Sequence, residues 1–397
     1  MSDRFRILAP PGAAERMAKT VTRRRFLGLS AVSLGGLAVG GSTLLTACGD
    51  DGGGDGGATA ATAAGPAELP EVGNLDLNLY TWAAYHDEGL LEDFGNVTID
   101  VYASNEEAIA KLAAAQGTAG YDMLVPTGPY IPQLAAQELL QPLDLDAIPN
   151  FENLDEPYRD QPWDPGNQYS VCKDWGSTGW IYDNTVLTDS VATHADFIAA
   201  CQGPASGETS VLDTQNNLLG LYFFANGIDW NTGDEAELDE AEAFLVDELA
   251  PHIKAFNSYP GIDLVSGNFT LSHAWNGDAR QGLLSVDNPD QFTWVLGAPR
   301  TEIWMDTFAI PTGAPHPENA YAWLNFMLDP ENSVTDLIFH GYNTGIVGVQ
   351  DLVPADLQYG EMIFFDDEQV ATMDAQVVND SLDRRVDIYN RVKAAAG

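Results

Sequence analysis

The stretch LYTWAAYHDEGLLEDF, residues 79–94, places two large aromatic side chains where a strand passes into a helix. An apolar run from Leu75 to Leu79 leads into Trp82 and Tyr85, and an amphipathic segment follows directly, which is expected to form a helix around 88–94. Side chains in the middle of an element pack into a core, whereas a strand-to-helix corner directs them into the crevice at the carboxyl ends of a sheet. Open α/β proteins hold ligands in that crevice. Trp82 and Tyr85 are therefore the first candidate binding residues.

Strands and helices are predicted to alternate from this corner onward. Residues 97–102 and 121–126 are predicted strands, and a helix is expected between Ser104, a suitable N-cap, and Gly117, a suitable stop. A proline-rich stretch at 151–170 interrupts the pattern, and a second set follows. Its predicted strands are 179–184, 209–213, 269–277 and 303–311, and its helices lie near 194–201, from 215, at 235–252 and at 317–328. This order predicts parallel sheets with helices on both faces.

The composition bounds the function. The chain has 397 residues, of which 45% are hydrophobic, so two domains with sizeable cores are expected. A formal net charge of −42 argues against nucleic-acid binding, because phosphates would be repelled. Two interpretations of the acidity remain: a solvated surface that keeps the protein soluble in high salt, or a specific attraction for cationic partners.

Residues 1–47 are predicted to be a targeting segment. Arg23 and Arg24 precede an apolar pair, as in twin-arginine export signals. The sequence LTAC, ending at Cys48, resembles the bacterial lipoprotein processing box, in which the Cys becomes the lipidated first residue. Residues 48–73 are rich in Gly, Ala and Asp and are expected to form a flexible tether. The alternative to a cleaved, lipidated segment is that residues 1–47 remain as an uncleaved membrane anchor.

Catalytic and metal-binding signatures are absent from the sequence. It contains no GxSxG, HExxH or phosphate-binding loop, and its six histidines lack ligand spacing, so we expect no enzyme, metal or cofactor. Once Cys48 is lipidated, Cys172 and Cys201 remain. Outside the cytoplasm such a pair forms either a disulfide or two buried thiols, and the sequence leaves both open.

Aromatic residues are paired with acids at other predicted strand ends. Trp275 lies three residues before Asp278, and Trp304 lies two before Asp306, so these last two share one face of a strand. Tyr342 is a further aromatic beside glycine. An indole face and a carboxylate together suit an organic cation, which gains cation–π and charge-assisted contacts. For any single tryptophan the alternative is ordinary core packing.

The ordered motifs resemble those of the bacterial periplasmic spermidine/putrescine-binding proteins, the polyamine-binding solute receptors of ABC transporters. The stretches that carry the resemblance are LYTWAAY, SNEEAIAKL, YDMLVPTGPYI, the proline-rich crossover, AWNGDA, IWMDTFAIP, AWLNFML and GYNTG, all in the family's order. The resemblance implies an α/β, two-lobed periplasmic binding protein fold of type II. Each lobe is a sheet flanked by helices, and the ligand cleft lies between them.

The resemblance also implies domain bounds and chain crossings. Lobe 1 would comprise residues 74–180 and 306–350, and lobe 2 residues 181–300 and 354–397. The chain would cross between the lobes near 178–183, 299–305 and 349–354.

Matching positions imply the ligand-binding residues, namely Trp82, Tyr85, Thr127, Tyr130, Trp275, Asp278, Trp304, Asp306 and Tyr342. Trp275, Trp304 and Tyr342 would line the ligand's methylenes, and Asp306 would bind an amine. Asp278 matches an acid of the putrescine-preferring branch. The chain departs from the family at Thr214 and Asn217, where carboxylates are usual, and at Ala84. These changes favour a shorter diamine or another amine over a long triamine.

The sequence therefore predicts an exported, extracytoplasmic lipoprotein, a monomer that delivers a polyamine such as putrescine or spermidine to an ABC permease. It would contact the membrane through lipidated Cys48. Three alternatives remain: a receptor of the same fold for another solute, a secreted hydrolase, and a purely structural lipoprotein.

Overall fold

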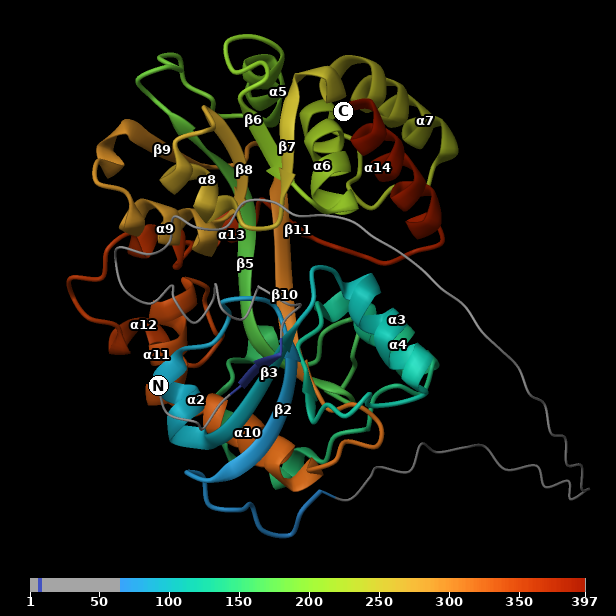
Figure 1. Cartoon of the computed structure of the whole chain (residues 1–397), viewed down its shortest axis with the longest axis vertical. Coiled ribbons are helices and arrows are strands. Elements are labelled where there is room, and N and C mark those ends of the chain that lie inside the picture. The colour runs from blue at the N-terminus through green and yellow to red at the C-terminus, as the bar shows by residue number, and fades with distance from the viewer. Residues whose placement is uncertain (1–5, 9–64, 397) are drawn as a thin grey trace, which may run out of the picture.

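Two halves of the molecule share a pair of long central strands (Figure 1). The computed structural model describes residues 6–8 and 65–396. Strand β5 (Ser170–Asp183) and strand β10 (Thr301–Ala309) run lengthwise from one half into the other. They pair antiparallel along most of β10, so they form the continuous backbone link between the halves.

The lower half in Figure 1 holds the N-terminal part of the described chain. Its strands are β2 (Leu75–Thr81), β3 (Gly95–Val101) and β4 (Met123–Leu124). Its helices are α2 (Glu88–Phe94), α3 (Asn105–Ala115), α4 (Ile131–Ala136), α10 (Pro317–Met327), α11 (Pro330–His340) and α12 (Val349–Leu352). Asp87 and Ser104 cap α2 and α3 by accepting backbone N–H groups, as their residue types favour.

The upper half holds the second set of elements. Its strands are β6 (Thr209–Leu212), β7 (Ile253–Asn257), β8 (Leu271–Trp275) and β9 (Phe292–Leu296), and β11 (Met373–Ala375) pairs with β10. Its helices are α5 (His194–Gln202), α6 (Gln215–Asn226), α7 (Glu235–Phe244), α8 (Pro260–Ser266), α9 (Asn276–Ser285), α13 (Asp367–Val370) and α14 (Leu382–Ala396). The helix predicted at 235–252 changes to π and 3-10 geometry after Phe244.

The sheet is mixed, and this corrects the prediction of purely parallel sheets. Strands β2, β3 and β4 are parallel to one another, as are β6, β7 and β8. Strand β10 runs antiparallel to β4 and β5, and β5 runs antiparallel to β8 and β9. The reason is that β5 enters the upper half and β10 returns from it, so the two strands have opposite directions. A further short strand, β1 (Arg6–Leu8), pairs parallel with β3.

Each half has its own hydrophobic core. One core packs β2, β3, α2, α10 and α11, and it contains Phe94, Trp323 and Cys172. The other packs α5, α6 and α14 against β5 and β6, and it contains Phe223 and Cys201. Both cysteines are buried free thiols. The structure therefore contradicts the disulfide alternative, because the two sulfurs lie in the cores of different halves.

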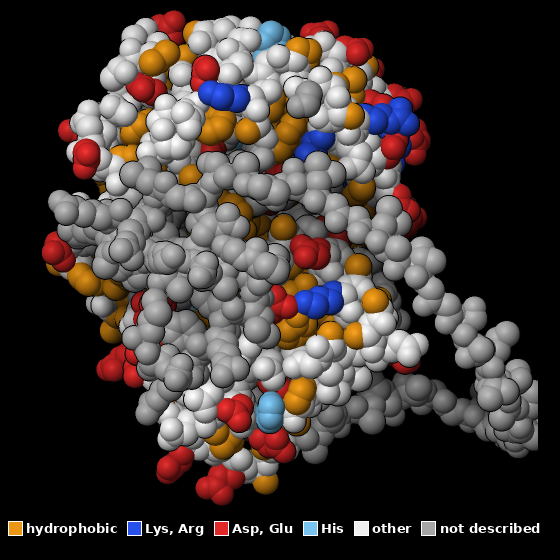
Figure 2. Space-filling view, in the orientation of Figure 1, with side chains coloured by type: hydrophobic (Ala, Val, Ile, Leu, Met, Phe, Trp, Pro, Cys, Tyr) orange, Lys and Arg blue, Asp and Glu red, His pale blue; other side chains and the backbone are white. Residues whose placement is uncertain are grey.

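Acidic side chains are scattered over the face shown in Figure 2, and lysines and arginines are few there. This distribution agrees with a solvated acidic surface.

Candidate binding site

The site is built on the stretch where β5 and β10 pair between the halves. Trp304 lies opposite Gly176, and Asp306 lies opposite Asp174. A Cβ on residue 176 would come within 2.5 Å of Trp304 Cζ2, so glycine leaves the space that the indole occupies. Because side chains alternate along a strand, Trp304 and Asp306 face the same side, as the sequence predicted.

Asp306 is the centre of a buried hydrogen-bond cluster in the lower half. The Tyr85 hydroxyl lies 2.8 Å from Asp306 Oδ2 and 2.5 Å from Asp174 Oδ1. Thr127 donates its hydroxyl hydrogen to Asp306 Oδ1 at 2.7 Å, and Asn105 fixes Thr127 through two hydrogen bonds. Asp306 is 6% exposed. The corner after β2, where Ala84 adopts a left-handed φ of 54°, brings Tyr85 into this position.

Tyr85 has one hydroxyl hydrogen for the two carboxyl groups of Asp174 and Asp306. Burial, Asp174 and Asp306 raise the pKa of Tyr85 well above its ordinary value, so the phenol stays protonated. Its single hydrogen serves only one of two carboxylates, although both lie within hydrogen-bonding distance. Burial and the nearby Asp174 raise the pKa of Asp306 to about 7, against the hydrogen bonds from Thr127 and Tyr85. Asp306 thus retains a proton up to near-neutral pH, and a cation would take the place of that proton.

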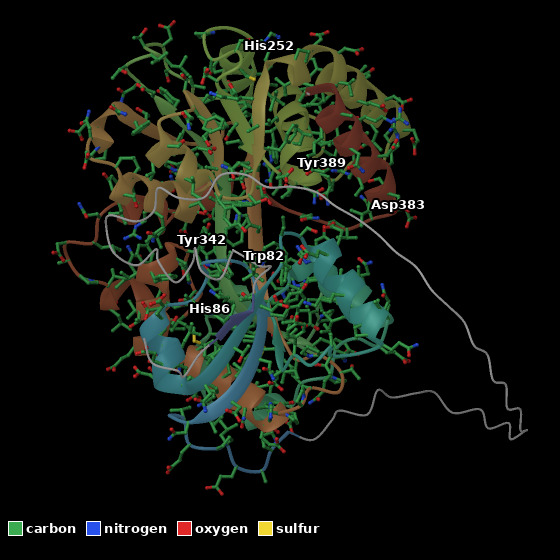
Figure 3. All side chains as sticks on the ribbon, viewed as in Figure 1. Trp82, His86, His252, Tyr342, Asp383 and Tyr389 are labelled. Carbon is green, nitrogen blue, oxygen red and sulfur yellow. The ribbon has the colours of Figure 1, made fainter. Side chains whose placement is uncertain are left out.

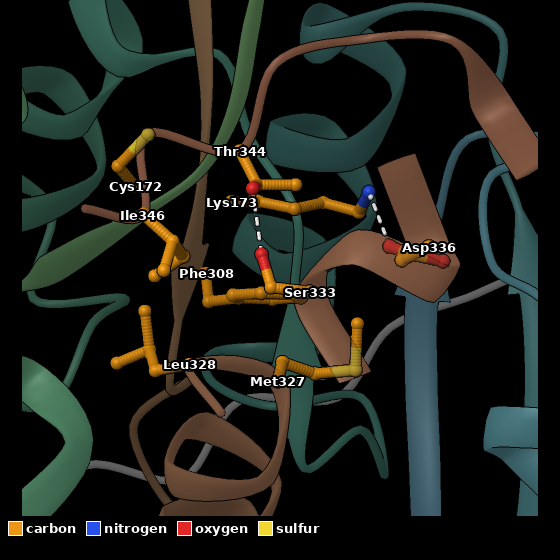
Figure 4. A pocket seen from close by; sticks show the side chains of 9 residues that line it. All are labelled: Cys172, Lys173, Phe308, Met327, Leu328, Ser333, Asp336, Thr344 and Ile346. Atoms are coloured by element: carbon orange, nitrogen blue, oxygen red, sulfur yellow. Dashed lines mark hydrogen bonds and ion pairs between the residues drawn. The ribbon is translucent and has the colours of Figure 1, made fainter. Parts of the chain in front are cut away.

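A buried lysine lies behind the cluster. Lys173 Nζ is 2.7 Å from Asp174 and 3.2 Å from Asp336, and it sits 3.9 Å from the centre of the Tyr85 ring. Burial alone would lower the pKa of Lys173, but the two carboxylates hold it above its ordinary value. Lys173 and Asp336 also line a small pocket, in which the Ser333 hydroxyl donates a hydrogen bond to the Thr344 hydroxyl (Figure 4). This lysine pairs with Asp174 and Asp336 and not with Asp306, which leaves Asp306 for an external cation.

Aromatic rings continue the site beside Asp306. The ring centroids of Trp304 and Tyr342 are 4.8 Å apart and the ring planes meet at 81°. The ring centroids of Tyr342 and Tyr85 are 6.0 Å apart. Tyr342 donates its hydroxyl hydrogen to Asp278 at 2.5 Å. Burial raises the pKa of Asp278 to about 6, against this hydrogen bond. Trp275 ends β8 and packs, like Trp304, against the lower core. Six predicted residues thus form one connected group: Tyr85, Thr127, Asp278, Trp304, Asp306 and Tyr342.

The remaining predicted residues lie at the edge of this group. Trp82 meets Tyr102 at 4.5 Å, and Figure 3 shows Trp82 and Tyr342 at the level where the halves meet. Tyr130 donates to Glu106 at 2.7 Å, and Gln215 of the upper half reaches the same Glu106 oxygen at 3.1 Å. Tyr130 therefore takes part in a polar bridge between the halves.

Two acids of this region were not predicted. Asp174 lies in β5, which begins at Ser170, whereas the predicted strand begins at residue 179. Glu302 is two residues before Trp304, and its carboxylate accepts hydrogen bonds from Thr178, at 2.8 Å, and from the Asn217 amide. Thr214 caps α6 with its hydroxyl. The upper half thus has a carboxylate beside Asn217 even though 214 and 217 are uncharged.

Within residues 6–8 and 65–396, no three His, Cys, Asp or Glu side chains are grouped so that they could hold a metal ion. In the same part of the chain, every helix is too short or too polar to cross a membrane.

The chain is similar to known solute receptors over most of its length. The family model for bacterial extracellular solute-binding proteins matches residues 84–358. A spermidine/putrescine-binding periplasmic protein of Escherichia coli is 30% identical over 324 residues, covering 78% of this chain and 89% of the relative.

Solved structures show the same fold. A spermidine/putrescine ABC transporter substrate-binding protein of Streptococcus pneumoniae superposes with a TM-score of 0.67 at 25% identity, covering 81% of this chain and 99% of that one. A Treponema pallidum lipoprotein superposes with a TM-score of 0.71 at 24% identity, covering 80% and 99%.

The chain belongs to the bacterial extracellular solute-binding protein family. The family resemblance and the two-lobed α/β fold predicted from the sequence are confirmed. The halves described above are the lobes of that fold. Members of this family are transport receptors, so the expectation of a protein that is not an enzyme is confirmed as well.

Proposed function

We propose that this protein is the extracytoplasmic receptor of an ABC importer for a short aliphatic polyamine. The observation that carries the proposal is Asp306, a buried carboxylate held by Tyr85 and Thr127 beside the Trp304 indole. An ammonium group would bind Asp306 through charge-assisted hydrogen bonds. Methylenes would lie on Trp304, Tyr342 and Trp275, and a cation at a desolvated ring face gains about 0.5 to 2 kcal/mol. The E. coli relative is named for spermidine and putrescine binding.

Export and anchoring complete the proposal. Arg23 and Arg24 would direct the chain to the twin-arginine pathway, and lipidation at Cys48 would leave the receptor attached to the cell membrane by the 48–73 tether. Residues 23, 24 and 48–64 lie outside the described residues. The receptor would work as a monomer and pass its ligand to a membrane permease. Globomycin, which blocks lipoprotein processing, should cause an unprocessed precursor to accumulate, and normal processing in its presence would contradict the anchor.

A thermal-shift panel tests the ligand class, because any ligand that binds only the folded state raises the melting temperature. We expect putrescine, cadaverine or spermidine to raise it and neutral sugars or amino acids to leave it unchanged. Asp306→Asn should abolish the shift, because it removes the charge that binds the ammonium group. Thr127→Ala should only reduce it, because Thr127 orients the Asp306 carboxylate through a hydrogen bond. Equal small effects of the two variants would contradict the assignment of Asp306.

A second candidate is a receptor of the same fold for a different amine or another small solute. The uncharged Thr214 and Asn217 favour it, because they remove two acids that the family uses for one amine end. The same panel distinguishes the two candidates. A melting-temperature rise with another solute, and none with diamines or triamines, would support the second.

A further inference from the structure

Glu302 is a buried acid at the upper end of the site. It is 6% exposed, and the Thr178 hydroxyl and the Asn217 amide both donate to its Oε2 atom. Neither of these two hydrogen bonds involves Oε1. Burial raises the pKa of Glu302 to about 7, although the two hydrogen bonds act in the opposite direction. A buried carboxylate in such a position is stabilised when a cation binds, because the cation compensates its negative charge in place of a proton.

Strand geometry aligns Glu302 with the rest of the site. Positions 302, 304 and 306 are every second residue of β10, so the side chains of Glu302, Trp304 and Asp306 lie on the same face of the strand. The cross-strand partner Thr178 lies on the same side of β5, two residues from Gly176, over which the Trp304 ring lies. An acid therefore stands at each end of a row with an indole between them.

The space beside Glu302 suits one small polar group. Glu302 lines a small cavity with room for about one water-sized group. The other lining residues are Thr178, His194, Asn217, Gly220, Leu221, Phe224, Trp230, His273 and Thr301. His273 is 3% exposed, and its Nδ1 atom has no hydrogen-bond partner among the described residues. An unpaired polar atom on a residue that lines the cavity favours a polar occupant there.

We propose that Glu302 binds the second ammonium group of a short diamine whose first ammonium group binds Asp306. This inference rests on the proposed function and names the ligand within its class. Four residues of strand separate the two acids by about 13 Å along β10. Side chains stand roughly perpendicular to a sheet, so the carboxylate spacing follows the backbone spacing.

The spacing selects the length of the ligand. An ammonium–carboxylate hydrogen bond of about 2.8 Å at each end leaves about 7 Å between the two nitrogens. An extended aliphatic chain advances about 1.25 Å per bond, so a diamine of four or five carbons fits. Phe224, Leu221 and Trp230 line the same cavity, and Glu302 is the only acid among the described residues that line it, so these residues offer no carboxylate for a third amine. Glu302 on β10 thus provides, next to Asn217, the carboxylate that positions 214 and 217 lack.

Calorimetric titration of 1,4-diaminobutane and 1-aminobutane tests the inference, because the monoamine lacks the group that Glu302 would bind. The wild-type protein should prefer the diamine by about 10- to 100-fold, the value of one charge-assisted hydrogen-bond pair. Glu302→Gln keeps the shape and should remove most of that preference, while monoamine affinity stays within about threefold. The matched control is Glu237→Gln on α7, another acid that accepts a threonine hydroxyl in the same lobe; it should leave the preference intact.

The outcomes separate the inference from the proposed function. Diamine binding that survives Glu302→Gln overturns the inference alone, and so does a preference that disappears in Asp278→Asn instead. A wild-type protein that binds no amine overturns both. If Glu302→Gln fails to fold, a wild-type series from 1,3-diaminopropane to 1,6-diaminohexane decides. Affinity should peak at four or five carbons, and a steady rise with length, or equal binding of the monoamine, would contradict the role of Glu302.

Discussion

Binding of a diamine should weaken as the pH is lowered from 8.5 to 5.5. Asp306 must be ionised to accept an ammonium group, and its pKa lies near 7 because it is buried next to Asp174. An aliphatic ammonium, with a pKa of about 10, stays charged throughout this range. The protein is therefore the partner whose charge changes, and a proton on Asp306 competes with the ligand.

The size of the effect follows from that pKa. At pH 5.5 Asp306 would be about 3% ionised, and at pH 8.5 about 97%, so the dissociation constant should differ by about 30-fold. Close to one proton should leave the protein for each ligand bound at pH 5.5, and almost none at pH 8.5. These figures count Asp306 alone. A diamine that also binds Glu302, whose pKa is about 7, should release a second proton at pH 5.5 and make the pH dependence steeper.

Calorimetry in two buffers of different ionisation enthalpy measures both the affinity and the protons released at each pH. Asp306→Asn should bind weakly and should lack its share of the pH dependence, which makes it the control. A dissociation constant that is the same within twofold at both pH values, with no proton exchange, would refute the reasoning that a proton on Asp306 competes with the ligand.

Three further predictions concern residues around the site. Lys173→Met should destabilise the protein by about 3 to 5 kcal/mol in urea unfolding, because Asp174 is left as a buried, uncompensated charge; a loss below 1 kcal/mol would contradict this role. Gln215→Ala removes the contact with Glu106, so the ligand-free protein should be more open in solution scattering, whereas an unchanged radius of gyration would argue against a bridge. Gly176→Ala should displace the Trp304 ring and weaken diamine binding by about tenfold in calorimetry, and full affinity would show that the ring is not confined there.

The parts of the site that repeat along a single element could be predicted from the sequence. Trp304 and Asp306 share a face because strand side chains alternate, and this holds wherever the strand is identified. The helix predicted around 88–94 is observed at Glu88–Phe94, where Asp87 caps it and Leu90, Leu91 and Phe94 are its buried residues. Local patterns of this kind need no knowledge of the tertiary structure.

Features that depend on pairing between distant segments were missed. Strand β5 begins at Ser170, nine residues before the predicted strand. Its first part was missed because Gly176 and Gly179 weaken the local strand pattern. Both glycines are explained only in three dimensions: a Cβ at 179 would lie 2.1 Å from the Val295 carbonyl oxygen, and one at 176 would meet Trp304. With β5 misplaced, Asp174 was not recognised.

The role of Glu302 was hidden for a similar reason. In the sequence it is an ordinary acid near a strand start, and only the fold places it next to Asn217, 85 residues earlier in the chain. The choice between a disulfide and two thiols at Cys172 and Cys201 likewise depended on which core each residue joins.

A crystal structure of the protein grown with 1,4-diaminobutane tests the central claim most directly. One nitrogen should lie within hydrogen-bonding distance of an Asp306 oxygen, in place of the hydrogen bond from Tyr85 or of the proton on Asp306, and the methylenes should lie on Trp304. Diamine bound away from Asp306 and Trp304, or a site that keeps its hydrogen bonds unchanged at saturating diamine, would contradict the account.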